Sequence, residues 1–183
     1  INTLLSDSGA SNVSTGAISS TSDVRGGADS VTAGNGSNFV IGGSAGDRID
    51  LGDGNNNVLA DIGSFTTDAQ TGALTVVTGA ADSRDGADSI TAGNGANNVL
   101  LGGANDTATF GTGANIIVGD GGSLNLTTGT VQSDSAAESG ADSIVAGSGT
   151  NLILGGSLAD RIDVAGGSDS ILGDTVTITF CAT

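Results

Sequence analysis

The stretch GADSVTAGNG at residues 27–36 returns as GADSITAGNG at residues 86–95 and as GADSIVAGSG at residues 140–149. Each copy begins a set of four nine-residue repeat units, here called rungs. In each rung an Asp or Asn follows a glycine-rich turn. The rung positions are Asp29, Asn38, Asp47, Asn56, Asp88, Asn97, Asp106, Asn115, Asp142, Asn151, Asp160 and Asp169. A fixed short period of this kind is the signature of a repeat architecture, so the period predicts the fold before any local pattern is considered.

Longer segments separate the sets of four rungs and divide the chain into modules. We predict module 1 at residues 1–61, module 2 at 62–120, module 3 at 121–174 and a C-terminal strand at 175–183. The excursions at 62–84 and 121–138 read as β-hairpins, because short apolar runs flank a Thr-Gly turn in each. Thr15 and Gly16 place a similar turn near the start, so we expect the chain to open with an excursion. Residues 175–180 alternate as the first strand of another excursion, whose partner strand is missing.

Alternating hydrophobicity within the rungs predicts two sheets. The Asp rungs alternate apolar and polar residues, which is typical of a sheet with one buried face. The Asn rungs are apolar on both faces, with the outward side chains Ile41, Leu59, Leu100, Val118, Leu154 and Leu172. An exposed row of aliphatic side chains would be an association site. We expect the excursion hairpins to cover it, with a neighbouring subunit or chain as the alternative.

The composition limits both the core and the partners. Aromatic residues make up 2% of the 183 residues, Gly accounts for 33 of them, and Pro, Trp, Tyr and Met are absent, so small aliphatic residues must build the core. The formal net charge is -16, with 20 acidic residues against four basic ones, which disfavours nucleic acid and anionic lipid as partners. We find no run of apolar residues long enough to insert into a membrane. The chain begins with Ile1, which suggests a mature or excised segment, and the single Cys181 leaves the redox compartment undecided.

Two rungs form one coil of about 18 residues, so Asp29 stacks on Asp47 at about 4.8 Å, the usual distance between strands. Asp88 and Asp106 form a second such pair, and Asp142 and Asp160 a third. Two carboxylates at that distance repel by about 3.5 kcal/mol at an effective dielectric of roughly 20. A hard cation between them reverses the sign, because carboxylate and turn carbonyl oxygens are ligands that Ca²⁺ accepts.

The rungs resemble the RTX (haemolysin-type) nonapeptide repeat, G-G-x-G-x-D-x-U-x, in the stretches Ala33–Val40, Ala92–Val99 and Gly155–Ile162. The resemblance covers the twelve rungs and implies an all-β fold, a parallel β-solenoid or β-roll of about six coils with Ca²⁺ between its turns. It also implies a secreted protein. The candidate metal ligands are Asp29, Asp47, Asp88, Asp106, Asp142, Asp160 and Asp169.

The chain departs from the repeat in two ways. Asn replaces Asp at positions 38, 56, 97, 115 and 151, which predicts a ladder of stacked amides on one side of the roll and a metal row on the other. The excursions are expected to interrupt the stacking, so that each module would hold one Asp/Asp site. A solenoid without metal remains the alternative, because Asp and Asn also cap turns by themselves.

Other acidic residues have structural explanations. We expect surface ion pairs, rather than metal ligands, at Asp50 with Arg48 and at Asp163 with Arg161. Asp61, Asp120 and Asp174 recur at the ends of the modules and are expected to shape the turn into each excursion, with a further metal role as the alternative.

The sequence favours a structural role over catalysis. It has no His and no Lys, and periodic carboxylates lack the distinct environments that acid and base catalysts require. We expect a calcium-binding structural or adhesive protein of the cell surface or extracellular space, such as an S-layer, an adhesin or a filament subunit. Self-association could proceed head to tail, with residues 175–180 adding as a strand to a neighbour. The alternatives are the C-terminal secretion and folding module of a larger secreted enzyme, or an ice-binding solenoid.

Overall fold

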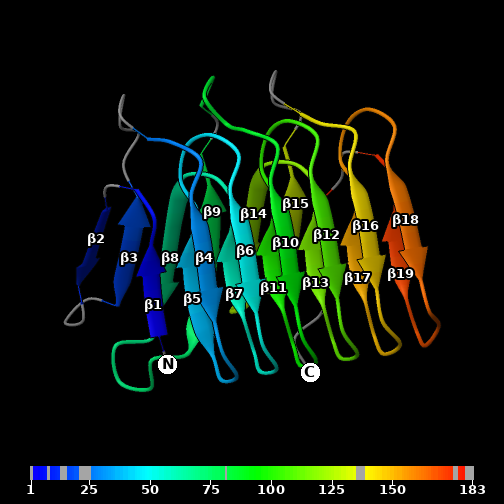
Figure 1. Cartoon of the computed structure of the whole chain (residues 1–183). Helices are drawn as coiled ribbons and strands as arrows, with labels where there is room; N and C mark the ends of the chain where they lie inside the picture. Colours follow the sequence, from blue (N-terminus) through cyan, green and yellow to red (C-terminus); the bar gives the residue numbers. More distant parts are fainter. Residues whose placement is uncertain are drawn as a thin grey trace.

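The computed structural model describes residues 2–7, 9–12, 16–20, 26–80, 82–134, 139–174 and 177–179. Over these residues the chain is all-β, and no helix is present that could cross a membrane. Figure 1 shows the parallel strands following one another across the molecule in chain order, from β1 in blue to β18 and β19 in orange. The predicted parallel β-roll with inserted hairpins is confirmed.

Three sheets make up the described structure. The first, here called the Asp sheet, is parallel and contains β4 (Ser30–Ala33), β6 (Arg48–Leu51), β10 (Ser89–Ala92), β12 (Thr107–Phe110), β16 (Ser143–Ala146) and β18 (Arg161–Val164). The second, the Asn sheet, is also parallel and contains β1 (Asn2–Leu5), β5 (Asn38–Ile41), β7 (Asn57–Leu59), β11 (Asn98–Leu100), β13 (Ile116–Val118), β17 (Leu152–Leu154) and β19 (Ser170–Leu172). The chain passes between these two sheets at every rung, which makes the roll.

The third sheet, the hairpin sheet, is antiparallel. It contains β2 (Gly9–Asn12), β3 (Ala17–Ser20), β8 (Gly63–Thr67), β9 (Leu74–Gly79), β14 (Gly122–Asn125), β15 (Thr130–Ser133) and β20 (Thr177–Thr179). The predicted hairpins are therefore confirmed as β8–β9 and β14–β15, and successive hairpins pair edge to edge. β20 pairs with β15 in the place of a first hairpin strand, as predicted, while residues 175, 176 and 180 lie outside the described part of the chain.

Two apolar layers hold the three sheets together. The layer inside the roll contains the inward side chains of the Asp and Asn sheets, including Ile49, Val58 and Ile117, which are fully buried. The second layer lies between the Asn sheet and the hairpin sheet and contains Leu100 and Leu154 together with hairpin residues. Burial of each such aliphatic side chain stabilises the fold by roughly 1.5–3 kcal/mol. The hairpins therefore cover the outward face of the Asn sheet, as the sequence predicted.

The largest side chains of the second layer come from different sheets. The rings of Phe39 on β5 and Phe65 on β8 meet edge to face, with centroids 5.4 Å apart and an interplanar angle of 74°. Phe65 is completely buried and Phe39 nearly so. An aromatic pair of this geometry contributes about 0.5–1.5 kcal/mol beyond its buried area, so it ties the hairpin sheet to the roll.

The prediction that the excursions interrupt the stacking is wrong. β6 pairs directly with β10, with Ile49 opposite Ile90, although a hairpin lies between them in the chain. β12 pairs with β16 in the same register as the other rungs. The hairpins leave the roll sideways and return to it at the next coil, because their apolar faces pack on the Asn sheet. Both sheets of the roll consequently continue across the module boundaries.

The start of the chain was also predicted wrongly. It opens with a rung of the roll, because β1 pairs in parallel with β5 and Asn2 lies opposite Asn38. The hairpin formed by β2 and β3 comes after this rung. Asn2 and Asp7 have the same spacing as Asn56 and Asp61, but no glycine-rich turn precedes Asn2 in the sequence to mark it as a rung.

Candidate calcium site

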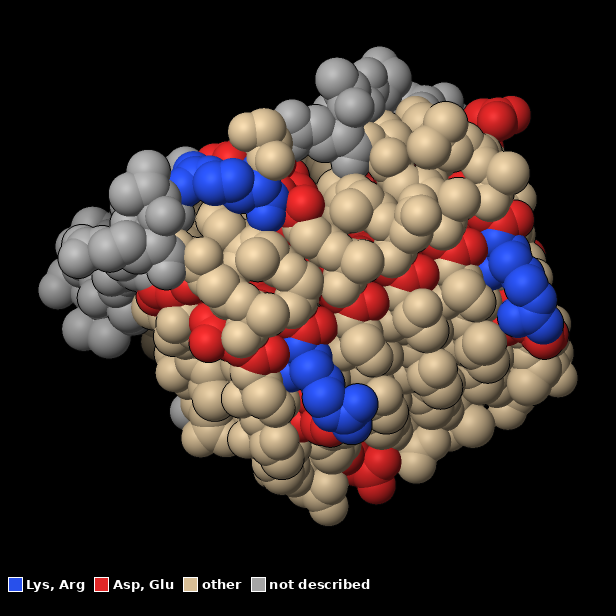
Figure 2. All heavy atoms as spheres, turned by 45° about the horizontal axis from the view of Figure 1, so that its top comes forward, with Lys and Arg blue, Asp and Glu red and all other residues tan. Residues whose placement is uncertain are grey.

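Six of the predicted ligands form one continuous row, here called the Asp column, at the start of the Asp-sheet strands. They are Asp29, Asp47, Asp88, Asp106, Asp142 and Asp160. The Oδ1 atom of each member after Asp29 accepts a hydrogen bond from the backbone N–H of the preceding member, at donor–acceptor distances of 2.7, 2.5, 2.7, 2.9 and 3.0 Å along the row. Figure 2 shows acidic atoms in a row across the face that carries the turns. The column continues without a break past the two places where a hairpin leaves the roll.

The second carboxylate oxygens of the column lack partners. Among the described residues, the Oδ2 atoms of Asp47, Asp88, Asp106, Asp142 and Asp160 are buried and accept no hydrogen bond. Asp47, Asp106 and Asp142 are each only 2% exposed. A buried charge without a partner costs several kcal/mol, so these oxygens require either a proton or a cation. The same unpartnered atom recurs in successive coils, which points to one repeated ligand.

Burial changes the acid–base chemistry of the column. Loss of hydration raises the pKa of Asp47 to about 6, of Asp142 to about 7, of Asp88 to about 8 and of Asp106 to about 10. Neighbouring carboxylates raise these pKa values further, while the N–H donors at Oδ1 act in the opposite direction. Burial also raises the pKa of Asp160. Positive charge beside the row would lower all of these pKa values again.

Backbone oxygens lie close to the unpartnered carboxylate oxygens. A β-carbon at Gly42 would lie 2.6 Å from Asp47 Oδ2 and closer still to the carbonyl oxygen of Ala60. One at Gly119 would lie 2.5 Å from Asp142 Oδ2, and the carbonyl oxygen of Gly155 would again be nearer. Glycine therefore leaves room at these turns for a carboxylate and a carbonyl oxygen to approach the same point.

These donors fit a calcium ion. Among the described residues, no three Asp, Glu, Cys or His side chains converge on one point, so backbone carbonyls would have to complete the coordination. Ca²⁺ accepts such mixed oxygen sets with flexible geometry. The buried Oδ2 atoms would then gain the positive partner that the protein itself does not supply.

The predicted Asn ladder is confirmed on the opposite side of the roll. Each amide donates one N–H from Nδ2 to the Oδ1 of the next rung at 2.7–2.9 Å, in the order Asn2, Asn38, Asn56, Asn97, Asn115, Asn151 and Asp169. From Asn38 to Asn151, Nδ2 also donates to the carbonyl of the residue four positions earlier in the chain, as Asn151 does to Gly147 at 3.0 Å. The amides thus satisfy one another's hydrogen-bonding groups along this side of the roll.

Asp169 stands apart from the other candidate ligands. It lies at the end of the Asn ladder, where its Oδ1 accepts hydrogen bonds from the Nδ2 and the backbone N–H of Asn151 at 2.8 and 3.0 Å. The structure therefore does not bring it together with the Asp column. Asp29 is the first member of the Asp column and is only half-buried.

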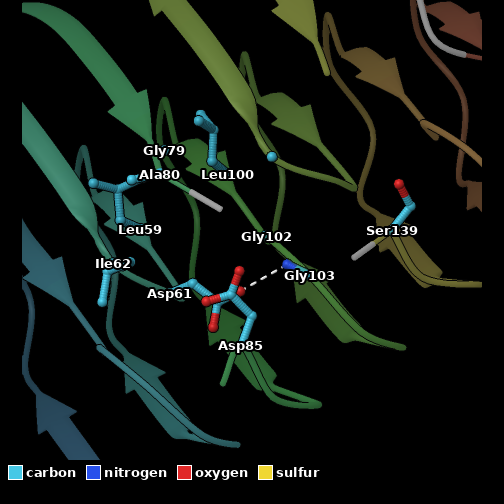
Figure 3. Close-up of a pocket in the computed structure, with 11 residues that line it drawn as sticks. Leu59, Asp61, Ile62, Gly79, Ala80, Asp85, Leu100, Gly102, Gly103 and Ser139 are labelled. Atoms are coloured by element: carbon cyan, nitrogen blue, oxygen red, sulfur yellow. Dashed lines mark hydrogen bonds between the residues drawn. The ribbon is translucent and has the colours of Figure 1, made fainter. Parts of the chain in front are cut away.

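The acidic residues at the module ends hold the turns where the hairpins leave the roll. Asp61 Oδ2 accepts a hydrogen bond from the N–H of Gly103 at 2.7 Å, shown in Figure 3, and Oδ1 accepts one from Gly86 at 3.4 Å. Asp120 makes the equivalent contacts with Ser157 and with Gly140. These bonds bridge the gap left by each departing hairpin, which supports the expected role in the exit turn.

Two further acidic residues lie at these turns and were not predicted from the sequence. Asp7 is a further member of the same set, because its Oδ2 accepts the N–H of Ser44 at 2.6 Å. Its position five residues after Asn2 was the available signal. Asp85 lines the same pocket as Asp61, and burial together with the charges of Asp88 and Asp85 raises the pKa of Asp61 to about 9. No periodic signal marks Asp85, since the equivalent positions are Gly26 and Ser139.

The predicted surface ion pairs are present. Arg48 contacts Asp50 at 2.5 Å and Arg161 contacts Asp163 at 3.2 Å, on the outward face of the Asp sheet. Exposed pairs of this kind contribute about 0–1 kcal/mol. Neither pair includes a member of the Asp column.

Comparison with known proteins agrees with this geometry. The family model for the RTX calcium-binding nonapeptide repeat matches residues 24–58, 82–108 and 137–171, which together make up just over half of the chain. No curated protein and no solved structure matches the chain. The chain belongs to the family of RTX calcium-binding nonapeptide repeats, which bind calcium ions.

Proposed function

We propose that this chain is a calcium-stabilised structural or adhesive β-roll of the cell surface or extracellular space, and that it is not an enzyme. The observation that carries the proposal is the row of buried, unpartnered Oδ2 atoms in the Asp column. RTX repeat proteins are typically secreted, and weak calcium sites are filled at the millimolar concentrations outside cells. Calcium supplies charge compensation here, and the chain's own residues hold the ions between successive coils.

The proposed ligands are the carboxylates of the Asp column, each completed by turn carbonyls such as that of Ala60 beside Asp47. The Oδ1 atoms are already fixed by backbone N–H groups, so the carboxylates are oriented before an ion binds. Calcium binding would therefore change the charge balance more than the side-chain positions. Asp169 remains a weaker candidate, because it lies in the other row.

A calcium titration tests this proposal. We expect the protein in chelator to melt at a lower temperature than in excess Ca²⁺. At a calcium concentration one hundred times the dissociation constant, binding would stabilise the fold by about 2.7 kcal/mol per site. Magnesium at the same concentration is the control, since it prefers a smaller, octahedral site. Identical melting curves in chelator and in calcium would favour the solenoid without metal.

We further propose that copies assemble head to tail. β20 and β2 are the outer strands of the hairpin sheet, and β19 and β1 are those of the Asn sheet. Both sheets have seven strands over the described residues, so one translation brings β1 of the next copy beside β19 and its β2 beside β20. The Asp sheet has six, which leaves one strand position open at the junction. Strand addition at exposed edges is a common mode of association.

The assembly proposal is tested by sedimentation in calcium. We expect the full chain to associate with increasing concentration, whereas a variant lacking residues 175–183 stays monomeric. Thr177→Lys is the milder variant, because Thr177 is exposed and a charge on an edge strand opposes pairing. Association of both variants at the level of the parent chain would contradict strand addition through β20.

The two alternative functions receive less support. An ice-binding face requires a regular array, but the outward column of the Asp sheet contains Asp50 and Asp163 within ion pairs among its threonines. A secretion and folding module of a larger enzyme would share the calcium response. It would differ in showing no self-association, so the sedimentation experiment separates it from the proposal.

A further inference from the structure

The Asn ladder has a direction. In every step the Nδ2 of one rung donates to the Oδ1 of the following rung, beginning with Asn2 to Asn38 at 2.9 Å and ending with Asn151 to Asp169 at 2.8 Å. One N–H of each amide from Asn38 onward is directed at the carbonyl of its own turn, so the other is available for the next coil. For the ladder to continue past a residue, that residue must both accept and donate.

The Asp169 side chain accepts hydrogen bonds but cannot donate one to a further residue. Its carboxylate takes both hydrogen bonds from Asn151 on Oδ1, and an ionised carboxylate has no N–H or O–H donor. All six of the preceding rungs in this row carry an amide. The ionised carboxylate of Asp169 therefore cannot continue the ladder.

An inward apolar side chain is left exposed on the last strand of the Asn sheet. Ile171 on β19 holds the inward position that Ile153 holds on β17, but Ile171 is 48% exposed and Ile153 is completely buried. At the other end of the roll, Leu4 and Ala33 pack only partly against the core. The two ends are cross-sections of the same repeat, so the partner that fits each of them best is the opposite end of another copy. Such stacking would repeat the contact between coils that already exists within the chain.

We propose that Asp169 limits this end-to-end stacking, because it presents an acceptor to the Oδ1 of Asn2 in the next copy where an asparagine would present a donor. The proposal rests on the head-to-tail arrangement proposed above, in which β1 of one copy lies beside β19 of another. Two acceptors facing each other without a hydrogen between them oppose burial. The junction is therefore weaker than the contact between coils within the chain.

The decisive variant is Asp169→Asn. The amide introduced by this substitution retains an Oδ1 that accepts from Asn151, so the fold is expected to remain intact, and its Nδ2 gains the ability to donate to Asn2 of the next copy. We expect the dissociation constant of self-association in calcium, measured by sedimentation velocity, to fall about tenfold, which corresponds to about 1.4 kcal/mol. Gain of one hydrogen bond and removal of one acceptor pair is of that order.

Two controls separate the ladder from net charge. Asp163→Asn makes the same change in charge on the same coil, but its side chain is exposed on the outward face of the Asp sheet and touches no ladder residue. We expect less than a twofold change for it. Asn2→Ala removes the acceptor of the next copy, so Asp169→Asn should give no gain in that background.

The outcomes also separate this inference from the proposed assembly. Equal association of the parent chain and Asp169→Asn overturns the inference and leaves the head-to-tail proposal standing. An equal gain in Asp163→Asn overturns it too, because net charge would then be the cause. Association of Asp169→Asn alone supports the inference and contradicts native assembly. No association by either chain overturns both.

Discussion

At the scale of the residue, Asp and Asn at equivalent positions of the same repeat solve the same stacking problem in different ways. The Asn97 amide donates to Asn115 and accepts from Asn56, so a neutral column satisfies itself. The Asp106 carboxylate accepts from the N–H of Asp88 through Oδ1, but its Oδ2 remains buried without a partner. One atom, nitrogen or oxygen, therefore decides which side of the roll is left with buried acceptors that have no partner.

This difference predicts the behaviour of Asp106→Asn. In chelator at pH 8 we expect the free energy of unfolding to rise by roughly 1–3 kcal/mol. The Asp106 carboxyl, whose pKa is raised to about 10, must take up a proton on folding at this pH, and a neutral amide removes that cost. The increase in melting temperature caused by calcium should shrink at the same time, since one ligand is lost. Thermal unfolding with and without calcium measures both effects. Asp163→Asn, at an exposed position, is the matched control, and a full calcium response in Asp106→Asn would rule out Asp106 as a ligand.

At the scale of the element, the hairpins behave as part of the core rather than as surface loops. They supply one wall of the second apolar layer, and they pair with one another into a continuous sheet. The Asn sheet is apolar on both faces for this reason: one face is covered by the Asp sheet and the other by the hairpins. Roll and hairpin sheet should therefore unfold together.

Phe65→Ala tests this cooperation. Phe65 is completely buried on β8 and meets Phe39 edge to face, so its truncation is expected to lower the free energy of unfolding by about 3–5 kcal/mol. Urea unfolding followed by circular dichroism measures the change as one cooperative transition. Leu126→Ala is the control, because Leu126 lies in the turn after β14 and is 40% exposed. A small loss of stability, or separate transitions for roll and hairpins, would contradict a shared core.

At the scale of the whole molecule, the acidic column makes stability depend on pH and calcium together. The folded pKa values of Asp47, Asp142 and Asp88, about 6, 7 and 8, lie above the ordinary value of 3.8. The folded state without calcium therefore binds protons more tightly than the unfolded chain. Its stability is fully present below about pH 4 and is lost as pH rises through 6 to 8.

Calcium should reverse this trend, because the ion binds the deprotonated carboxylates. We expect the melting temperature in chelator to fall between pH 4 and pH 8, and the calcium-induced increase to be larger at pH 8 than at pH 5. Melting curves across this range in calcium and in chelator are the measurement. A melting temperature in chelator that is independent of pH would show that folding does not raise the pKa values of the column.

The nine-residue period by itself determined the roll, its inner apolar layer, the apolar outward face of the Asn sheet and the separation of the Asp positions from the Asn positions. A strict period places equivalent side chains at the same point of every coil, so these features follow from local spacing alone. It also identified the exit-turn set through Asp61 and Asp120, because they recur at a fixed distance from a rung.

Only the tertiary structure decided which distant rungs touch. The contact of β6 with β10 across a hairpin joins Asp47 to Asp88, 41 residues apart, and the pairing of β1 with β5 adds Asn2 to the ladder. Likewise, the backbone N–H of the neighbouring coil satisfies each Oδ1, while burial leaves Oδ2 without water or another partner. Hydrogen bonding between strands and loss of hydration depend on neighbours in space, and the spacing of residues along the chain does not specify those neighbours once an excursion intervenes.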